Sequence, residues 1–255
     1  MDEERSILDM FGVDINYLTR VVKANPSLRG VIIGYIAERK LWDFFAADPR
    51  VTAIRKDDDH DRDNKGDLVI SYQGFDFRLE VKSLQTNSIK MLDAETGEWL
   101  PKIIKTPLPP ATGQKRKKNK WVECELFRTE WLKGGTKAKF KGNVQCDASD
   151  KREIELSNGT KVSTTNLKVG EFDILAMGLF AFREQWEFGF MLNRDLPRST
   201  HKAYPEKDRQ LLLKTLIPIE WPLPATCSGD PFVLMDTLVA ERQSTRPSPD
   251  ASETQ

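Results

Sequence analysis

The chain has 255 residues, of which 39 are basic and 39 acidic, so its formal net charge at pH 7 is zero. This balance argues against a protein that coats nucleic acid indiscriminately, while the 39% of hydrophobic residues suffice for a sizeable core. The three cysteines form no CxxC pair and there are only two histidines, so the sequence supports neither a disulfide framework nor a zinc or His-rich metal site.

The first residues predict a soluble intracellular protein. They are acidic where a secretory signal is basic and then apolar, and no run of about 18 apolar residues could cross a membrane. We expect one domain over residues 1–240, followed by a tail over residues 241–255 whose composition is typical of disorder.

Two helices are expected before the first strand. In residues 1–24 apolar side chains recur at helical spacing, which indicates one short amphipathic helix. Asn25-Pro26-Ser27 should end it and cap a second helix, SLRGVIIGYIAERKLWDFF. The wide apolar face of this second helix predicts that it lies against a sheet.

Strands follow in chain order. Val51 to Lys56 is the first, and Gly66 to Ser83 reads as a hairpin. Further strands are expected at Lys139 to Ala148 and at Arg152 to Thr164, the latter with a hairpin signal at Asn158-Gly159.

The C-terminal third is expected to begin with a buried strand. Phe172 to Phe182 is almost continuously apolar, as a strand buried on both faces would be. Trp186 to Leu192 should pair with it after a tight turn, and Asp208 to Leu216 should form a short helix. The pattern as a whole predicts an α/β (α+β) fold.

The hairpin brings three charged residues together. A two-residue turn at Gln73-Gly74 fixes the pairing of its strands and sets Asp67 opposite Glu80. Lys82 shares the face of these acids because side chains alternate along a strand. The other face is apolar throughout: Leu68, Ile70, Tyr72, Phe75, Phe77, Leu79 and Val81.

Two directly opposed carboxylates repel each other, so a positive charge is expected between them. Lys82 is one candidate, but a divalent cation is the better one, because oxygen ligands on rigid strands suit magnesium. The lysine would then orient or activate a water, or neutralise charge on a phosphate. The alternative is a solvated Glu-x-Lys pair without function.

These residues resemble the PD-(D/E)XK nucleases, the restriction-endonuclease-like superfamily. Asp67 matches the Asp of the motif, Glu80 its second acid and Lys82 its lysine, with Gly66 where the motif has proline. Glu38, within GYIAERK on the second helix, matches an additional helical acid of many members. It could equally be a surface residue paired with a neighbouring base.

The resemblance implies a restriction-endonuclease-like core, a mixed central β-sheet flanked by helices. Residues of about 27–83 and 172–195 would form this core, and a β-rich insertion of about 84–170 would recognise DNA. The implied activity is a Mg²⁺-dependent, site-specific double-stranded DNA endonuclease of the type II restriction class, with Mn²⁺ as a substitute metal. Its metal ligands would be Asp67, Glu80 and Glu38.

The resemblance also implies partners. Cutting both strands is most simply done by a homodimer, working in a prokaryotic or phage-infected cytoplasm beside a cognate DNA methyltransferase. The alternatives are a repair, phage or mobile-element nuclease of the same fold, or a catalytically inactive DNA-binding module.

Two segments are candidate DNA contacts. A basic run should meet phosphates, unless it is a merely solvated loop: Lys115, Arg116, Lys117, Lys118 and Lys120. The segment NVQCDASDKR should address base edges, unless it is a polar turn: Gln145, Asp147, Ser149, Asp150, Lys151 and Arg152. Asn193-Arg194-Asp195 and Arg198 could also face DNA.

Overall fold

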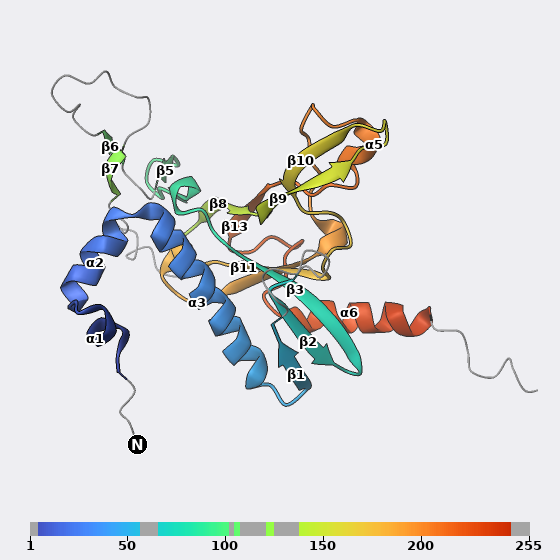
Figure 1. The fold of residues 1–255 in the computed structure, drawn as a ribbon, viewed down its shortest axis with the longest axis horizontal. Coiled ribbons are helices and arrows are strands. Elements are labelled where there is room, and N and C mark those ends of the chain that lie inside the picture. The colour runs from blue at the N-terminus through green and yellow to red at the C-terminus, as the bar shows by residue number, and fades with distance from the viewer. Residues whose placement is uncertain (1–4, 57–65, 102–104, 108–120, 125–137, 246–255) are drawn as a thin grey trace, which may run out of the picture.

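The structure is a computed structural model that describes residues 5–56, 66–101, 105–107, 121–124 and 138–245. Figure 1 labels most of its elements, which in chain order are α1 (Ile7–Phe11), α2 (Ile15–Ala24), α3 (Pro26–Ala46), β1 (Val51–Arg55), β2 (Leu68–Tyr72), β3 (Phe75–Ser83), the 3-10 helix η1 (Thr86–Ser88), β4 (Lys90–Leu92), β5 (Trp99–Pro101), β6 (Lys105–Pro107), β7 (Trp121–Cys124), β8 (Phe140–Gln145), β9 (Asp147–Glu155), β10 (Lys161–Asn166), β11 (Ile174–Gly178), α4 (Phe180–Arg183), β12 (Phe188–Leu192), the 3-10 helix η3 (Asn193–Asp195), α5 (Glu206–Arg209), β13 (Leu216–Trp221) and α6 (Pro231–Ser244).

A mixed five-stranded sheet forms the centre of the fold, in the order β1-β2-β3-β11-β12. Its first three strands are antiparallel neighbours, β11 runs parallel to β3, and β12 runs antiparallel to β11. The hairpin register is the expected one, since Tyr72 pairs with Phe75 and Leu68 with Leu79. Gln73 and Gly74 have φ of 48° and 77°, and positive φ at both central positions is what a type I′ turn requires.

Helices α3 and α6 cover one face of this sheet. The buried residues of α3 repeat every fourth position, which is why a single stripe of the helix meets the strands. The prediction that this helix lies against a sheet is therefore confirmed. The core on this side includes Ala37, Leu41 and Phe45 of α3, Phe232, Met235 and Val239 of α6, and Leu68, Ile70, Tyr72, Phe77, Leu79 and Val81 of the hairpin.

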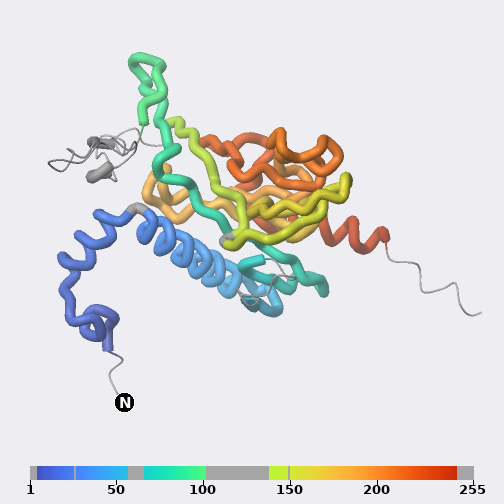
Figure 2. Tube along the Cα trace, turned by 45° about the horizontal axis from the view of Figure 1, so that its top comes forward, coloured from blue at the N-terminus to red at the C-terminus, as the bar shows by residue number. Residues whose placement is uncertain are grey.

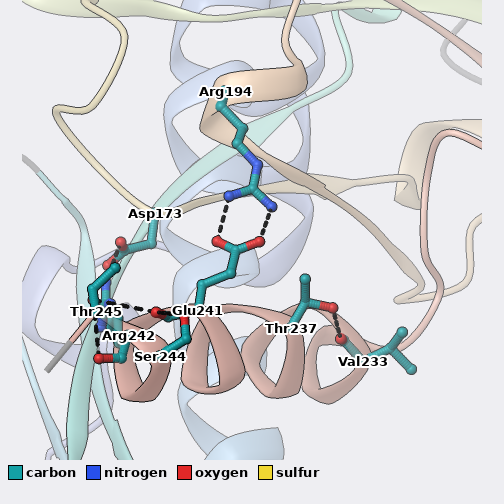
Figure 3. A network of polar contacts seen from close by, with 8 residues as sticks. All are labelled: Asp173, Arg194, Val233, Thr237, Glu241, Arg242, Ser244 and Thr245. Atoms are coloured by element: carbon teal, nitrogen blue, oxygen red, sulfur yellow. Dashed lines mark hydrogen bonds and ion pairs between the residues drawn. The ribbon is translucent and has the colours of Figure 1, made fainter. Parts of the chain in front are cut away.

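Two ion pairs fix α6 to the rest of the fold (Figure 3). Arg242 contacts the Asp173 carboxylate and also donates to the backbone oxygen of Asp76 at 2.8 Å, while Arg194 forms a two-pronged pair with Glu241. The expectation of disorder from about residue 241 is thus wrong for the residues up to Ser244, which belong to α6.

A second sheet of four strands, β13-β8-β4-β5, packs on the opposite face of the central sheet. Its core joins Phe140 and Val144 of β8 to Leu175 and Met177 of β11. The segment of residues 84–170 is β-rich in its described parts, as expected. It shares this core with the central sheet, and β13 from beyond β12 completes its sheet, so the fold is a mixed α+β arrangement.

Strands β9 and β10 form the hairpin expected at Asn158-Gly159. Its register pairs Lys161 with Glu155 and Val162 with Ile154, and Gly159 has φ of 77° at the turn. The buried Asp208 of α5 accepts hydrogen bonds from the backbone and side chain of Ser157 and ties α5 to this turn.

The N-terminal 24 residues form two helices, which corrects the expectation of one. Gly12, with φ of 63°, ends α1, and Asp14 caps α2 by accepting from the Tyr17 N–H at 2.6 Å. Asn25 separates α2 from α3 as expected. Its side chain, however, donates to the Val21 carbonyl oxygen and makes no cap for α3.

Three expectations in the C-terminal third are also wrong. The strand expected to reach Phe182 ends at Gly178, and the last apolar residues form α4, where Phe182 stacks on Phe140. An apolar run does not distinguish a buried strand from a buried helical turn. This turn replaces the expected tight connection to β12. The helix expected over Asp208 to Leu216 is limited to α5, and Leu216 already starts β13.

Among the described residues, no helix is long and apolar enough to cross a membrane.

Candidate functional site

The hairpin places Asp67, Glu80 and Lys82 at one end of the central sheet. Asp67 directly precedes β2, and the other two lie on β3. Their neighbours Leu79 and Val81 belong to the core beneath the helices, so strand alternation turns Glu80 and Lys82 toward the opposite face. Glu80 is only 5% exposed. Carboxylates are rarely buried to this extent unless they have a charged partner.

The positive charge expected between the two acids is provided by Lys82. Its Nζ lies 2.6 Å from Glu80 Oε1 and 3.9 Å from Asp67 Oδ2. The same Asp67 oxygen accepts a hydrogen bond from the backbone N–H of Val81 at 2.6 Å. One backbone bond and one ammonium group therefore hold the two carboxylates together.

The pKa of Lys82 follows from this placement. Burial by itself would lower it, but the charges of Glu80 and Asp67 and the hydrogen bond to Glu80 outweigh burial, so the pKa is raised above its ordinary value. The lysine is thus fully protonated at neutral pH and acts as a cation and hydrogen-bond donor.

Gly66 explains how Asp67 reaches β3. Its φ is 140°, and a Cβ built on it would lie 3.3 Å from the Cβ of Arg78. Side-chain-bearing residues rarely adopt this conformation, and here the neighbouring strand also crowds the position. The glycine that departs from the proline of the named motif therefore has a local structural reason.

Glu38 is oriented by a different partner. Lys56, the residue after β1, lies 2.7 Å from Glu38 Oε2 and its Nζ is 5.3 Å from the centre of the Tyr35 ring. The neighbouring Ala37 approaches Gly178 at the end of β11, which puts Glu38 at the same end of the sheet as Lys82. Lys56 was not identified from the sequence, where it looks like one more charge before a polar loop.

The two hairpin acids suit a hard divalent cation. Magnesium usually keeps several waters and takes only one or two protein carboxylates, and Asp67, Glu80 and Lys82 together leave one net negative charge. Within the described residues, no three His, Cys, Asp or Glu side chains form a group that could hold a metal. The expected ligand set that includes Glu38 is thus not gathered in this structure.

A row of polar side chains adjoins the site. Gln85, just beyond β3, donates to the Gln145 side-chain oxygen, and Gln145 donates to Asp147 Oδ2 at 3.0 Å. The Gln85 N–H donates to the Asn143 carbonyl oxygen at 2.9 Å, which places β8 beside the end of β3. Burial, and then the negative charge of Glu80, raise the pKa of the intervening Cys146 to about 12. Neither Gln85 nor Cys146 was singled out by the sequence.

The other residues predicted to read bases differ in their exposure and in their contacts. Asp150 and Lys151 are exposed on β9. Because residues 147–155 form this strand, the alternative that the segment is a polar turn is wrong for them. Arg152 is held internally by the Glu171 carboxylate and the Asn166 carbonyl oxygen. The side chain of Ser149 lies outside the described part of the chain.

The remaining candidate DNA contacts are of two kinds: residues outside the described part of the chain, and residues that make contacts within the fold. The basic run lies outside the described residues: Lys115, Arg116, Lys117, Lys118 and Lys120. Arg194 is paired with Glu241, and Arg198 donates to the carbonyl oxygens of Leu196 and Arg194. Asn193 is buried and accepts from the Gly170 N–H, so this segment serves the fold.

Comparison of the chain with protein-family models, curated proteins and solved structures gives no match. Any functional assignment therefore depends on the geometry of the residues themselves.

Proposed function

We propose that the chain is a Mg²⁺-dependent endonuclease that hydrolyses double-stranded DNA at specific sites, as a type II restriction enzyme does. The observation that carries this proposal is the convergence of Asp67 and Glu80 on the Lys82 ammonium group at one end of the sheet. The element order supports it, since a helix, three antiparallel strands and a strand parallel to the third occur in sequence. One difference from the named core is that strands, rather than a helix, fill most of the described chain between β3 and β11.

Each residue has a distinct role in this proposal. Bound magnesium lowers the pKa of a water and offsets charge on the scissile phosphate. Asp67 and Glu80 hold the cation, Asp67 being oriented by the Val81 N–H. Lys82 donates to the water or the phosphate and offsets negative charge there. Glu38, held by Lys56, acts as an accessory acid.

The amide row gives the proposed enzyme a means of reading bases close to the cut. Gln85 and Gln145 present amide groups that can pair with adenine in the major groove, and Asp147 supports the second of them. Gln85 lies three residues beyond Lys82, just after the end of β3, so base reading would take place next to the strand that carries the hydrolytic residues.

The test is cleavage of plasmid DNA with magnesium by the native protein, Asp67→Asn and Lys82→Ala. Both variants should lose cleavage by about 10²-fold or more, as removal of a group that stabilises transition-state charge does. Asp76→Asn is the matched control, since Asp76 lies on the same strand and face but is bound to Arg55 and Ser71 near the turn. Undiminished cleavage by both site variants would exclude this active site.

A second candidate is a DNA-binding module of the same fold without catalysis. It is favoured by the pairing of Glu38 with Lys56, which offsets the charge of the proposed accessory acid. Titration of the native protein with Mn²⁺ separates the nuclease from the binding module. Metal binding is measured from the paramagnetic broadening of the solvent water signal. Specific DNA binding without metal binding or cleavage would support the module. Cleavage directed by DNA structure or ends would instead indicate a repair, phage or mobile-element nuclease.

A further inference from the structure

Large exposed apolar side chains gather in the first 36 residues. They lie on α1, α2 and the first half of α3: Ile7, Met10, Phe11, Ile15, Tyr17, Leu28, Val31, Tyr35 and Ile36. In the rest of the described chain, such side chains are scattered over α3, a loop, β13 and α6: Phe44, Leu211, Leu216 and Val233. Single exposed apolar residues are ordinary, whereas nine of them on three consecutive helices favour an interaction surface.

The helices that carry this group need support. α1 and α2 have five and ten residues, and neither contains a buried residue, whereas isolated helices this short are marginal in water. Figures 1 and 2 show α1 and α2 leading away from the N-terminal end of α3 and from the central sheet. Among the described elements, α2 contacts α3 and β7. We call residues 5–24 the N-terminal arm. Its exposed apolar side chains leave a surface that a further apolar partner would stabilise.

The distribution of charged residues along the chain indicates which partner would cover the arm. Within the described residues 5–14, two acids stand against one base: Asp9 and Asp14 against Arg5. Residues 15–37 carry no acid and three bases, Arg20, Lys23 and Arg29. An element that is acidic at one end and basic at the other is complementary to an antiparallel copy of itself.

We propose that the N-terminal arm pairs antiparallel with the arm of a second copy of this chain and buries the exposed apolar side chains of α1, α2 and α3. Setting Asp14 against Lys23 of the second copy places the two-fold axis close to Thr19. A lipid surface fits less well, because anionic lipids attract basic segments and repel Asp9 and Asp14. The pairing uses none of the proposed catalytic residues, so it stands or falls independently of nuclease activity.

Cross-linking tests the position of the axis. Thr19→Cys should form a disulfide between copies under mild oxidation, because residues at a two-fold axis face themselves. Thr237→Cys is the matched control: both threonines are exposed on helices and bond to the carbonyl oxygen four residues earlier. The native protein gives the background from its own cysteines. Cross-linking of Thr19→Cys no faster than that of Thr237→Cys overturns the proposed pairing.

Sedimentation of the full chain over a range of concentrations tests the surface itself. The native protein should dimerise, and Phe11→Ser and Ile15→Ser should each weaken the dimer by about tenfold or more, since truncating a central apolar anchor commonly does so. Val233→Ser, at a similarly exposed site on α6, should leave it unchanged. A native monomer at all concentrations, or arm variants that dimerise normally, refutes the proposal, as does a monomer that binds anionic vesicles through the arm.

Discussion

The ammonium group of Lys82 lies 2.6 Å from the carboxylate of Glu80, which is itself only 5% exposed. Among the ion pairs described at the candidate site, this one has the least exposed side chains. Breaking a buried pair leaves an uncompensated charge in a low-dielectric environment, whereas breaking an exposed pair has little effect.

Lys82→Met should therefore lower the free energy of unfolding by about 3 kcal/mol, the usual cost of leaving one buried partner unpaired. Lys161→Met, which breaks an exposed pair with Glu153, should cost less than about 1 kcal/mol. Urea denaturation measures both. Adding Glu80→Gln to Lys82→Met should recover part of the loss, and no recovery would show that the loss comes from packing instead of charge.

Magnesium offers a second measurement on the same variant. If a cation binds between Asp67 and Glu80, it should replace the missing ammonium charge and raise the melting temperature of Lys82→Met more than that of the native protein. Equal shifts in the two proteins would contradict a metal site at these carboxylates.

Gly66 and Gly34 should respond oppositely to alanine. Gly66→Ala introduces a Cβ at φ of 140° and 3.3 Å from Arg78, and should destabilise the fold by about 1–3 kcal/mol. Gly34→Ala lies within α3 with nothing within 4 Å of the new Cβ, and should stabilise it by up to about 1 kcal/mol. Thermal unfolding of the two variants decides the signs. A neutral Gly66→Ala would remove the local reason for glycine before Asp67.

Alkaline pH should destabilise the protein through its buried thiols. Burial raises the pKa of Cys146 to about 12 and that of Cys227 to about 11, from an ordinary value of 9.0. Above about pH 9 the unfolded chain releases the two thiol protons, while the folded state still holds them. The contribution of the thiols to the free energy of unfolding is therefore complete below pH 9 and is lost as the pH rises toward the pKa values of the folded state. Cys146→Ala and Cys227→Ala should each flatten the decline in unfolding free energy between about pH 8 and about pH 10.5. An unchanged slope in both would contradict this cause.

The two ion pairs of α6 should differ in strength. Arg242 pairs with Asp173, bonds the Asp76 backbone and lies 4.6 Å from the centre of the Phe77 ring. Arg242→Met should therefore cost about 1–2 kcal/mol. The Arg194–Glu241 pair is about half exposed on both sides, and Arg194→Met should cost less than about 1 kcal/mol. Equal losses in chemical denaturation would contradict this ranking.

The sequence by itself determined the hairpin and its charged face. Alternation and a two-residue turn fix a strand register locally, and the observed pairing of Tyr72 with Phe75 is the predicted one. The same logic placed Asp67 opposite Glu80 with Lys82 beside them. The stripe of α3 that meets the sheet was also readable, because helical spacing of apolar residues is a local signal.

Only the tertiary structure decided how the remaining parts meet. Gln85 and Lys56 lie near the site through chain folding, and no spacing in the sequence relates Gln85 to Gln145 or Lys56 to Glu38. Similarly, the apolar run that ends in Phe182 was compatible with strand or helix until its packing on Phe140 selected a helical turn. From the sequence alone, Arg152 looked like a base-reading residue. Its bond to Glu171 is not visible there, because the proximity of the two residues depends on the whole fold. Local periodicity fixes which face of an element is apolar, whereas long-range contacts decide which charged side chains remain available for function.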